Sequence, residues 1–322
     1  MRVIAAQMTA WCVVGSALVL GQAAQTPTDT TAPDIPGVVA GGTKVQLIQT
    51  WDAGLGGEGP VAMPDGSVLF TQQNARKVIK IDKNGTLSTY LDTAPNQVLA
   101  LAYDLKGRLI GTHRGQPYGV VVLAPTRSTL ADRFEGQVFG RPNDLVIDKK
   151  GGVYFTDNTG PRPEQPPPPP GSKPGVYYIK PDGQVLRVSD ALVQPNGIQL
   201  SPDEKVLYVG AGSASVVTAL DVQPDGRLSN PRDFGPVSEP GVSGGADGMA
   251  MDAAGRLYVA ANAGIIVFSP KGGKPLGIIP MSIKPSNVAF AGSDRKTLYA
   301  VSARGAAFKI AMKAEGVKDR AK

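Results

Sequence analysis

One short pattern recurs six times along this chain, and it restricts the fold more than any other feature. In five copies, a residue with a side-chain oxygen lies eight positions before a turn residue that introduces a short apolar strand. These polar residues, at what we call the key position, are Glu58, Asn143, Asn196, Asp247 and Asn287. A sixth copy runs from Leu99 to Gly107 and has leucine at the key position. Such a repeat indicates one supersecondary unit used six times.

The spacing of the units indicates a β-propeller. Successive key positions are 40 to 53 residues apart, which is the length of a four-stranded propeller blade. Further turns lie inside the units, for example at Pro181-Asp182-Gly183, where proline presets φ and glycine accepts a positive φ. We therefore predict an all-β fold, a six-bladed β-propeller with four antiparallel strands per blade. A β-sandwich is the alternative architecture, but six near-equal units fit it poorly.

The last unit is one strand short. Only three strands are expected from Asn287 onward, whereas residues 44 to 51 alternate between apolar and polar like a strand. This N-terminal strand would supply the missing fourth strand, which would close the ring and cover an exposed sheet edge. The predicted catalytic propeller domain spans residues 43–312.

The two ends of the chain carry separate predictions. Residues 1–24 have Arg2, an apolar run and small residues near Ala24, as in a signal peptide. Export to the periplasm or the cell exterior is therefore expected, with an uncleaved anchor as the alternative. Residues 25–42 are rich in Thr, Pro and Gly and are predicted to be a disordered linker. Residues 313–322 are predicted to be a frayed basic tail.

Charge and cysteine content restrict the possible partners. The formal net charge is +6, but the basic residues are scattered, whereas nucleic-acid binding requires a concentrated stripe. We expect no nucleic-acid partner, and no membrane partner once the signal is removed. The single cysteine, Cys12, lies in the predicted signal, so the mature chain would need no disulfides. Nothing in the sequence specifies an oligomeric state.

The polar key positions predict a metal site. Innermost propeller strands all run the same way along the channel, so these side chains should converge at one mouth. Two carboxylates and several amides form an all-oxygen set, which favours Ca²⁺, Mg²⁺ or Mn²⁺ over a structural Zn²⁺. For any one residue the alternative is a polar cap at the start of a strand, but five residues in register favour the site. Calcium is our first choice, with Zn²⁺, Mg²⁺ or Mn²⁺ as alternatives.

The same residues carry a family resemblance. The motifs Glu58-Gly59-Pro60-Val61, Arg141-Pro142-Asn143-Asp144, Pro195-Asn196-Gly197-Ile198 and Asp247-Gly248-Met249 resemble those of the gluconolactonase / senescence-marker-protein (regucalcin) family of calcium-dependent lactonases. The resemblance covers about residues 45 to 311. It implies that Glu58, Asn196 and Asp247 bind the metal. Asn143 would be a further ligand or a substrate contact, and Arg141 and His113 would face the substrate hydroxyls.

The implied reaction is hydrolysis of a gluconolactone-like sugar lactone to its aldonic acid. Asp247 would be the general base, with Glu58 as the alternative base. The chain departs from the family pattern at Ala62, at Gln72-Gln73 and at Gly210-Ala211-Gly212, which concerns the pocket walls and hence the substrate. Other possibilities are therefore a non-sugar lactone or aryl ester as substrate, or a non-catalytic propeller stabilised by metal.

Two features have alternative interpretations. His113 is either a substrate contact or a structural residue that bonds blade two to blade three. The loop from Gly160 to Pro174 contains five consecutive prolines and should be extended. It is either a semi-rigid wall beside the site or a tolerated surface insertion.

Overall fold

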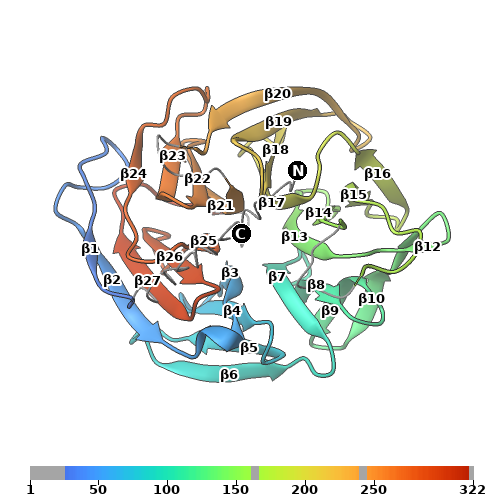
Figure 1. The fold of residues 1–322 in the computed structure, drawn as a ribbon, viewed down its shortest axis with the longest axis horizontal. Helices are drawn as coiled ribbons and strands as arrows, with labels where there is room; N and C mark the ends of the chain where they lie inside the picture. Colours follow the sequence, from blue (N-terminus) through green and yellow to red (C-terminus); the bar gives the residue numbers. More distant parts are fainter. Residues whose placement is uncertain (1–25, 161–166, 239–244, 319–322) are drawn as a thin grey trace, which may run out of the picture.

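The six repeated units fold into six antiparallel sheets that stand side by side around a central axis (Figure 1). This computed structural model describes residues 26–160, 167–238 and 245–318. Each sheet is one blade, and its first strand lies nearest the axis. The predicted six-bladed β-propeller is confirmed, with four strands in blades one to five. The predicted signal peptide falls in residues 1–25, outside the described residues.

The strands follow the chain in order. Blade one contains β3 (Glu58–Ala62), β4 (Val68–Gln72), β5 (Lys77–Ile81) and β6 (Leu87–Asp92). Blade two contains β7 (Gln97–Tyr103), β8 (Leu109–Arg114), β9 (Gly119–Ala124) and β10 (Ser128–Ala131). Blade three contains β13 (Pro142–Ile147), β14 (Val153–Asp157), β15 (Gly175–Ile179) and β16 (Val185–Ser189). Between blades two and three lies a small hairpin of β11 (Arg133–Phe134) and β12 (Gln137–Val138).

The second half repeats this order. Blade four contains β17 (Pro195–Leu200), β18 (Val206–Ala211), β19 (Val216–Val222) and β20 (Leu228–Pro236). Blade five contains β21 (Ala246–Met251), β22 (Leu257–Ala261), β23 (Gly264–Phe268) and β24 (Gly277–Ile279). Blade six contains β25 (Asn287–Ala291), β26 (Thr297–Ser302), β27 (Ala306–Ala311), β2 (Lys44–Thr50) and β1 (Thr30–Thr31). A single 3₁₀ turn, η1 (Ala53–Leu55), connects β2 to blade one.

The repeated turn has the same backbone conformation in all six blades. The turn residue adopts a left-handed φ between 55° and 86° in every copy, at Gly66, Gly107, Gly151, Glu204, Gly255 and Arg295. Glycine reaches this region without strain, which explains why four of the six copies use it. The turn fixes where the second strand of each blade starts, and therefore the register with the first.

Hydrophobic side chains pack between blades rather than at one centre. Successive residues of an innermost strand point to opposite neighbours, because side chains alternate along a strand. In β3, Val61 packs towards blade two, whereas Ala62 packs towards blade six. There is one such cluster of buried residues at each of the six blade interfaces. The innermost strands are therefore apolar on both faces, as in other sheets covered on both sides.

The N-terminal strand closes the ring as predicted. β2 pairs with β27 in antiparallel register, with Val45 opposite Ile310 and Thr50 opposite Ala306. Figure 1 places β1 and β2 at the outer edge of the last blade, beside β24. Blade six thus holds both ends of the propeller together.

The predicted disordered linker over residues 25–42 is wrong for the residues that the structure describes. Residues 30 and 31 form β1, and Ile35, Val38 and Val39 are fully or almost fully buried between blades five and six. Thr30 also donates a hydrogen bond of 2.6 Å to the Pro280 carbonyl. Composition misled the prediction because three well-placed apolar residues are enough to anchor an otherwise polar segment.

The predicted frayed tail also begins later than expected. Ala314 is buried, and Val317 packs against the cluster between blades four and five. The Lys313 and Gly316 amides donate to the Val38 and Arg295 carbonyls at 2.8 and 2.9 Å. Residues 313–318 therefore belong to the folded body, and residues 319–322 lie outside the described part.

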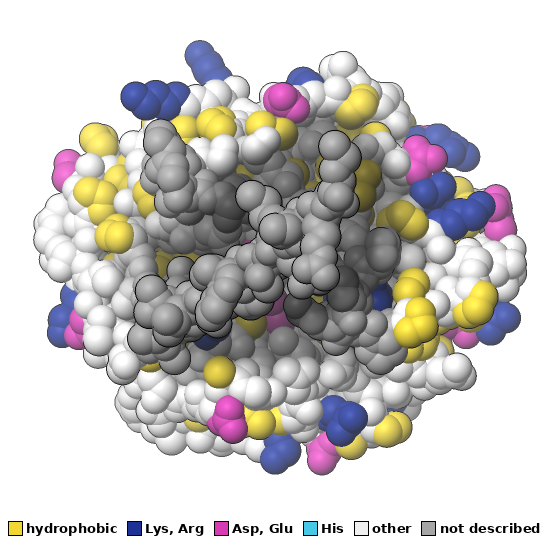
Figure 2. Space-filling model, viewed as in Figure 1, with side chains coloured by type: hydrophobic (Ala, Val, Ile, Leu, Met, Phe, Trp, Pro, Cys, Tyr) yellow, Lys and Arg dark blue, Asp and Glu magenta, His cyan; other side chains and the backbone are white. Residues whose placement is uncertain are grey.

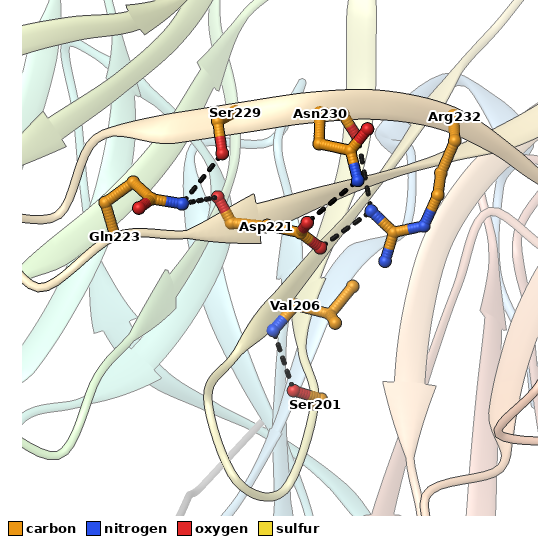
Figure 3. Close-up of polar contacts among 7 residues, drawn as sticks. All are labelled: Ser201, Val206, Asp221, Gln223, Ser229, Asn230 and Arg232. Atoms are coloured by element: carbon orange, nitrogen blue, oxygen red, sulfur yellow. Dashed lines mark hydrogen bonds and ion pairs between the residues drawn. The ribbon is translucent and has the colours of Figure 1, made fainter.

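Polar contacts on the outer strands are local, as blade four illustrates (Figure 3). Asp221 on β19 accepts from Arg232 at 2.7 Å and from Asn230 at 3.0 Å, both on β20. The Ser201 hydroxyl accepts from the Val206 amide at 3.0 Å and so stabilises the repeated turn of this blade. These contacts hold each blade together away from the channel.

The surface carries both signs of charge. Figure 2 shows Lys and Arg side chains interspersed with Asp and Glu around the periphery of the face in view. In the described part of the chain, no helix has the length and apolar character needed to cross a membrane.

Candidate active site

Four side chains at the key position are accessible on strands that are otherwise buried. Each of β3, β13, β17 and β21 has one partly exposed residue, and its remaining residues are buried. These four residues are Glu58, Asn143, Asn196 and Asp247. They lie at the start of their strands, at the same mouth of the channel. The structure therefore presents all four proposed ligands on one surface.

The backbone changes register next to the key positions. In the first five blades the innermost strand has a β-bulge, which places two residues opposite one on the second strand. In β13, for example, Pro142 pairs with Asp157 but Leu145 pairs with Phe155. Bulges bend a strand and redirect its side chains, and they are common beside functional sites. The strand β25 of blade six has no such shift.

Glycine after the key position allows neighbouring blades to approach closely. A Cβ atom at Gly197 would overlap the carbonyl oxygen of Asp247. A Cβ atom at Gly248 would overlap the side-chain amide of Asn287. The motifs Asn-Gly and Asp-Gly are thus explained by packing around the axis.

Threonine hydroxyls fix the backbone of two key residues. Thr112 on blade two donates to the Asn143 carbonyl of blade three at 2.6 Å. Thr156 on blade three donates to the Asn196 carbonyl of blade four, also at 2.6 Å. Each bond crosses a blade interface, so the position of one key residue depends on the blade before it.

Glu58 and Asp247 are electrostatically coupled. Burial, followed by the negative charge of Asp247, raises the pKa of Glu58 from 4.5 to about 8. The Gly59 amide, the Asn287 side chain and the Arg114 charge act in the opposite direction but do not cancel this effect. Two carboxylates held together in this way favour a proton or a cation between them.

Asn287 supports Glu58 rather than joining the accessible set. Its side chain is only 2% exposed, and it hydrogen-bonds the Glu58 carboxylate. Its Oδ1 accepts from the Val288 amide at 2.9 Å. Blades one and six are therefore linked at the mouth, and Asn287 helps to orient a proposed ligand.

Arg141 is positioned by a buried carboxylate. Asp157 accepts hydrogen bonds from the backbone amides of Gly140 and Arg141 at 2.7 and 2.8 Å. Burial raises the pKa of Asp157. The Arg141 guanidinium donates to the Gly160 carbonyl. Asp157 thus fixes the backbone just before Asn143, which explains why the Thr-Asp pair ends β14.

His113 is buried within blade two and does not line the pocket described below. Its side chain is 1% exposed, with Nδ1 2.6 Å from the Pro117 carbonyl and Nε2 3.3 Å from an Arg127 nitrogen. Burial lowers the pKa of this histidine, so the neutral ring is favoured. These partners all belong to blade two, so His113 joins parts of its own blade and we do not assign it to the substrate.

A pocket of about 480 Å³ opens over blades one to three, and none of the four proposed ligands contributes to its lining. Leu99, Arg114 and Arg141 line it, together with Pro167 and Pro168 of the proline-rich loop. This placement supports the interpretation of that loop as a wall of the site, for the residues that the structure describes. The apolar key residue of blade two, Leu99, forms part of the pocket surface.

Two further residues lie at the site, and the sequence did not single them out. Arg114 lines the pocket and its charge lowers the pKa of Glu58. It follows His113, so strand alternation could have identified it, because neighbours on a strand point to opposite faces. Lys284 Nζ lies 3.7 Å from Asp247 Oδ2. It comes from the loop before β25, where no sequence pattern marks it.

Comparison with known proteins agrees with this geometry. Residues 56–304 match the family described as the SMP-30/gluconolactonase/LRE-like region. This chain belongs to that family. The matched region runs from just before Glu58 to the turn before β27, so the SMP-30/gluconolactonase/LRE-like region covers blades one to five and the first two strands of blade six.

Curated relatives of this SMP-30/gluconolactonase/LRE-like chain are lactone-cleaving enzymes by name. A gluconolactonase of Zymomonas mobilis is 34% identical over 171 residues, which are 48% of this chain and 45% of that protein. The lactonohydrolase oryL of Aspergillus oryzae is 31% identical over 222 residues, which are 61% and 50% of the two chains. The chain thus spans about half the length of these two relatives.

Among solved structures, a gluconolactonase from Xanthomonas campestris is 26% identical, with a TM-score of 0.77, covering 91% of this chain and 99% of that one. The calcium-binding protein regucalcin from Agrobacterium tumefaciens is 18% identical, with a TM-score of 0.69, covering 85% and 95%. At that identity, regucalcin indicates the shared fold alone.

Proposed function

We propose that this protein hydrolyses a sugar lactone to the corresponding aldonic acid at the channel mouth. The observation that carries the proposal is the set of four accessible oxygen-bearing side chains on otherwise buried innermost strands. The gluconolactonase and lactonase relatives support the reaction class. Export of the protein, from its predicted signal peptide, belongs to the same proposal.

The residues at the mouth fit a divalent cation. Burial raises the pKa of Glu58, and the negative charge of Asp247 raises it further. A cation between the two carboxylates would favour their ionised forms. Glu58, Asn196 and Asp247 would hold it, with Asn143 as a fourth oxygen donor, and Ca²⁺ suits such a set. When bound, a divalent cation supplies Lewis-acid polarisation of a carbonyl oxygen and lowers the pKa of a bound water.

The remaining chemistry falls to side chains. Asp247 accepts the proton of the attacking water as general base, and this proton then passes to the ring oxygen as the ester bond breaks. Arg141 and Asn143 orient the lactone, which holds the reacting carbonyl beside Asp247. Water attack, ring opening and proton transfer together give one aldonic acid and consume one water.

The experiment is lactone hydrolysis by the purified protein, followed as acid release. We expect glucono-δ-lactone to be hydrolysed, activity to disappear with a chelator, and Ca²⁺ to restore it. Glu58→Gln and Asp247→Asn should each lower kcat/KM by about 100-fold or more. Asp221→Asn makes the same chemical change on the outer strand β19 and should have little effect.

Three results would change the proposal. Full activity after complete metal removal would exclude the metal, and a fully active, metal-bound Asp247→Asn variant would exclude Asp247 as base. Turnover of aryl esters or non-sugar lactones alone would change the substrate class. Metal-stabilised folding without turnover of any lactone would indicate a binding protein.

A further inference from the structure

The pocket over blades one to three has a strongly basic lining. Arg76, Arg114 and Arg141 contribute to it, and none of the described residues that line it is Asp or Glu. The rest of the lining consists of amide, apolar, glycine and tyrosine side chains. The charge of Arg114 acts on Glu58. A neutral sugar lactone offers hydroxyl groups, for which amides suffice, so the guanidinium groups of Arg76 and Arg141 require another explanation.

The three arginines come from different loops on the mouth side. Arg76 ends the β4–β5 turn, Arg114 ends β8, and Arg141 immediately precedes β13. Because these elements belong to blades one, two and three, their convergence is produced by the propeller and not by sequence proximity. Leu99, at the key position of blade two, lines the same pocket next to them.

Neutral acceptors help to hold two of these guanidinium groups in place. Arg114 donates through Nε to the Pro142 carbonyl at 3.1 Å and through a terminal nitrogen to Asn158 Oδ1 at 3.3 Å. Arg141 donates to the Gly160 carbonyl. These bonds orient the guanidinium groups, and the Arg114 charge also acts on the nearby Glu58 carboxylate. Arginine recognises carboxylates and phosphates through paired N–H donors.

We infer that the substrate lactone carries an anionic group, a carboxylate or a phosphate, that binds in this arginine-lined pocket. The inference rests on the proposed lactonase function. The lactone carbonyl would lie at Asp247 and Glu58, and the anion would lie over blades one and two. The charged group would be distant from the reacting carbonyl and would serve binding and selection.

Arg76 provides the test because it is exposed at the rim of the pocket. Its backbone has a positive φ of 56°, so Arg76→Gln, which keeps a similar unbranched side chain, adds no new backbone strain. Lys77 is the next residue, is also exposed, and does not line the pocket. Lys77→Gln therefore makes the same change in net charge at a matched position.

The substrates are compared in pairs of equal ring size. Glucono-δ-lactone is paired with 6-phosphoglucono-δ-lactone, and glucono-γ-lactone with glucaro-γ-lactone. We expect kcat/KM to be at least about tenfold higher for an anionic member, since hydrogen bonds to charged groups contribute about 1.5–3 kcal/mol. Arg76→Gln should reduce this preference threefold or more through KM, whereas Lys77→Gln should change it less than twofold. The pair with the larger preference distinguishes phosphate from carboxylate.

Binding of unreactive acids gives an answer independent of turnover. Calorimetry should show that glucarate binds more tightly than gluconate. Arg76→Gln should reduce the ratio of these two affinities at least threefold. Equal affinity for the monoanion gluconate and the dianion glucarate, or equal losses in both variants, would overturn the inference. Hydrolysis of neutral lactones without any preference would leave the proposed function intact and remove the anion subsite. Selective glucarate binding without hydrolysis of any lactone would support the anion subsite and remove the proposed function.

Discussion

The Thr156 hydroxyl donates a 2.6 Å hydrogen bond to the carbonyl oxygen of Asn196, across the interface between blades three and four. The same hydroxyl accepts from the Asp144 amide at 3.1 Å. One small side chain therefore connects the backbone after Asn143 to the backbone of Asn196. Ligand geometry at the mouth depends on this second strand as well as on the ligands themselves.

Replacing Thr156 by valine should weaken the metal site. Thr156→Val keeps the shape but leaves a buried amide and a buried carbonyl without this partner, at a cost of about 1–3 kcal/mol in the free energy of unfolding. Because Asn196 loses its support, we also expect metal affinity to fall about threefold to tenfold. Denaturation and calorimetric titration measure the two effects.

Tyr154→Phe is the matched control for that variant. The Tyr154 hydroxyl donates at 2.8 Å to the Gly226 carbonyl and also joins blades three and four, but at the β19–β20 turn away from the mouth. This variant should lose stability without losing metal affinity. Equal affinity losses in both variants would show that Thr156 acts only through general stability.

Metal binding should strengthen as the pH rises towards 8. Burial and the charge of Asp247 raise the pKa of Glu58 to about 8, and a carboxylate must lose its proton to bind metal. We expect affinity for Ca²⁺ to increase by up to about tenfold per pH unit between pH 6 and 8, then to level off. Titrations at several pH values test this, and Glu58→Gln should flatten the dependence. A pH-independent affinity in the unmodified protein would contradict it.

The same shift predicts how the metal-free protein responds to pH. The folded-state pKa of Glu58 lies above its ordinary value of 4.5. Its contribution to stability is therefore fully present below about pH 4.5 and is lost as the pH rises through about 8. Melting temperatures measured with a chelator should show this loss relative to Glu58→Gln, and saturating Ca²⁺ should remove it. Identical pH profiles for the two metal-free proteins would be inconsistent with the shift.

Gly248→Ala should displace Asn287. The added Cβ would overlap the Asn287 amide, which is buried and bonded to Glu58. We expect a loss of about 1–3 kcal/mol in stability from overpacking, together with weaker metal binding. In Gly212→Ala, the added Cβ would lie 3.8 Å from the Asn196 side-chain nitrogen, an ordinary contact. That control should retain stability, and a fully stable Gly248→Ala variant would contradict the packing argument.

Ile35→Ala should destabilise the propeller although Ile35 precedes the ring. Ile35 is 2% exposed within the cluster between blades five and six, and truncating such a residue costs about 2–5 kcal/mol. Val193→Ala, at a position that is 76% exposed, is the control and should change stability by less than about 0.5 kcal/mol. Chemical denaturation measures both, and equal stability would mean that residues 26–42 contribute nothing.

The repeat made the fold predictable, because the offset of eight residues ends at a left-handed turn in every blade, although only blades one to five have the bulge. It also placed Glu58, Asn143, Asn196 and Asp247 at one mouth. Asn287 shares the offset, but its strand lacks the bulge, so its side chain stays buried. The offset alone could not reveal this difference, since a bulge depends on pairing with the next strand.

Contacts between distant segments were the part that sequence did not reveal. His113, the only histidine in the sequence, was a predicted substrate contact, yet the next residue, Arg114, lines the pocket instead. Burial of Ile35, Val38 and Val39 depends on residues of blades five and six, more than 200 positions later. Local composition carries no information about such a partner.

Strand β2 joins the final blade, where Val45 pairs with Ile310. Nearly the whole domain separates these two residues in the sequence. Closing so large a loop is entropically costly and slows folding. During synthesis, five blades can stack in succession, while the first strand of the domain remains unpaired until the last one is available. A chain truncated before residue 306 would therefore form an open arc instead of a shortened ring, with two unpaired strand edges that could pair with other chains.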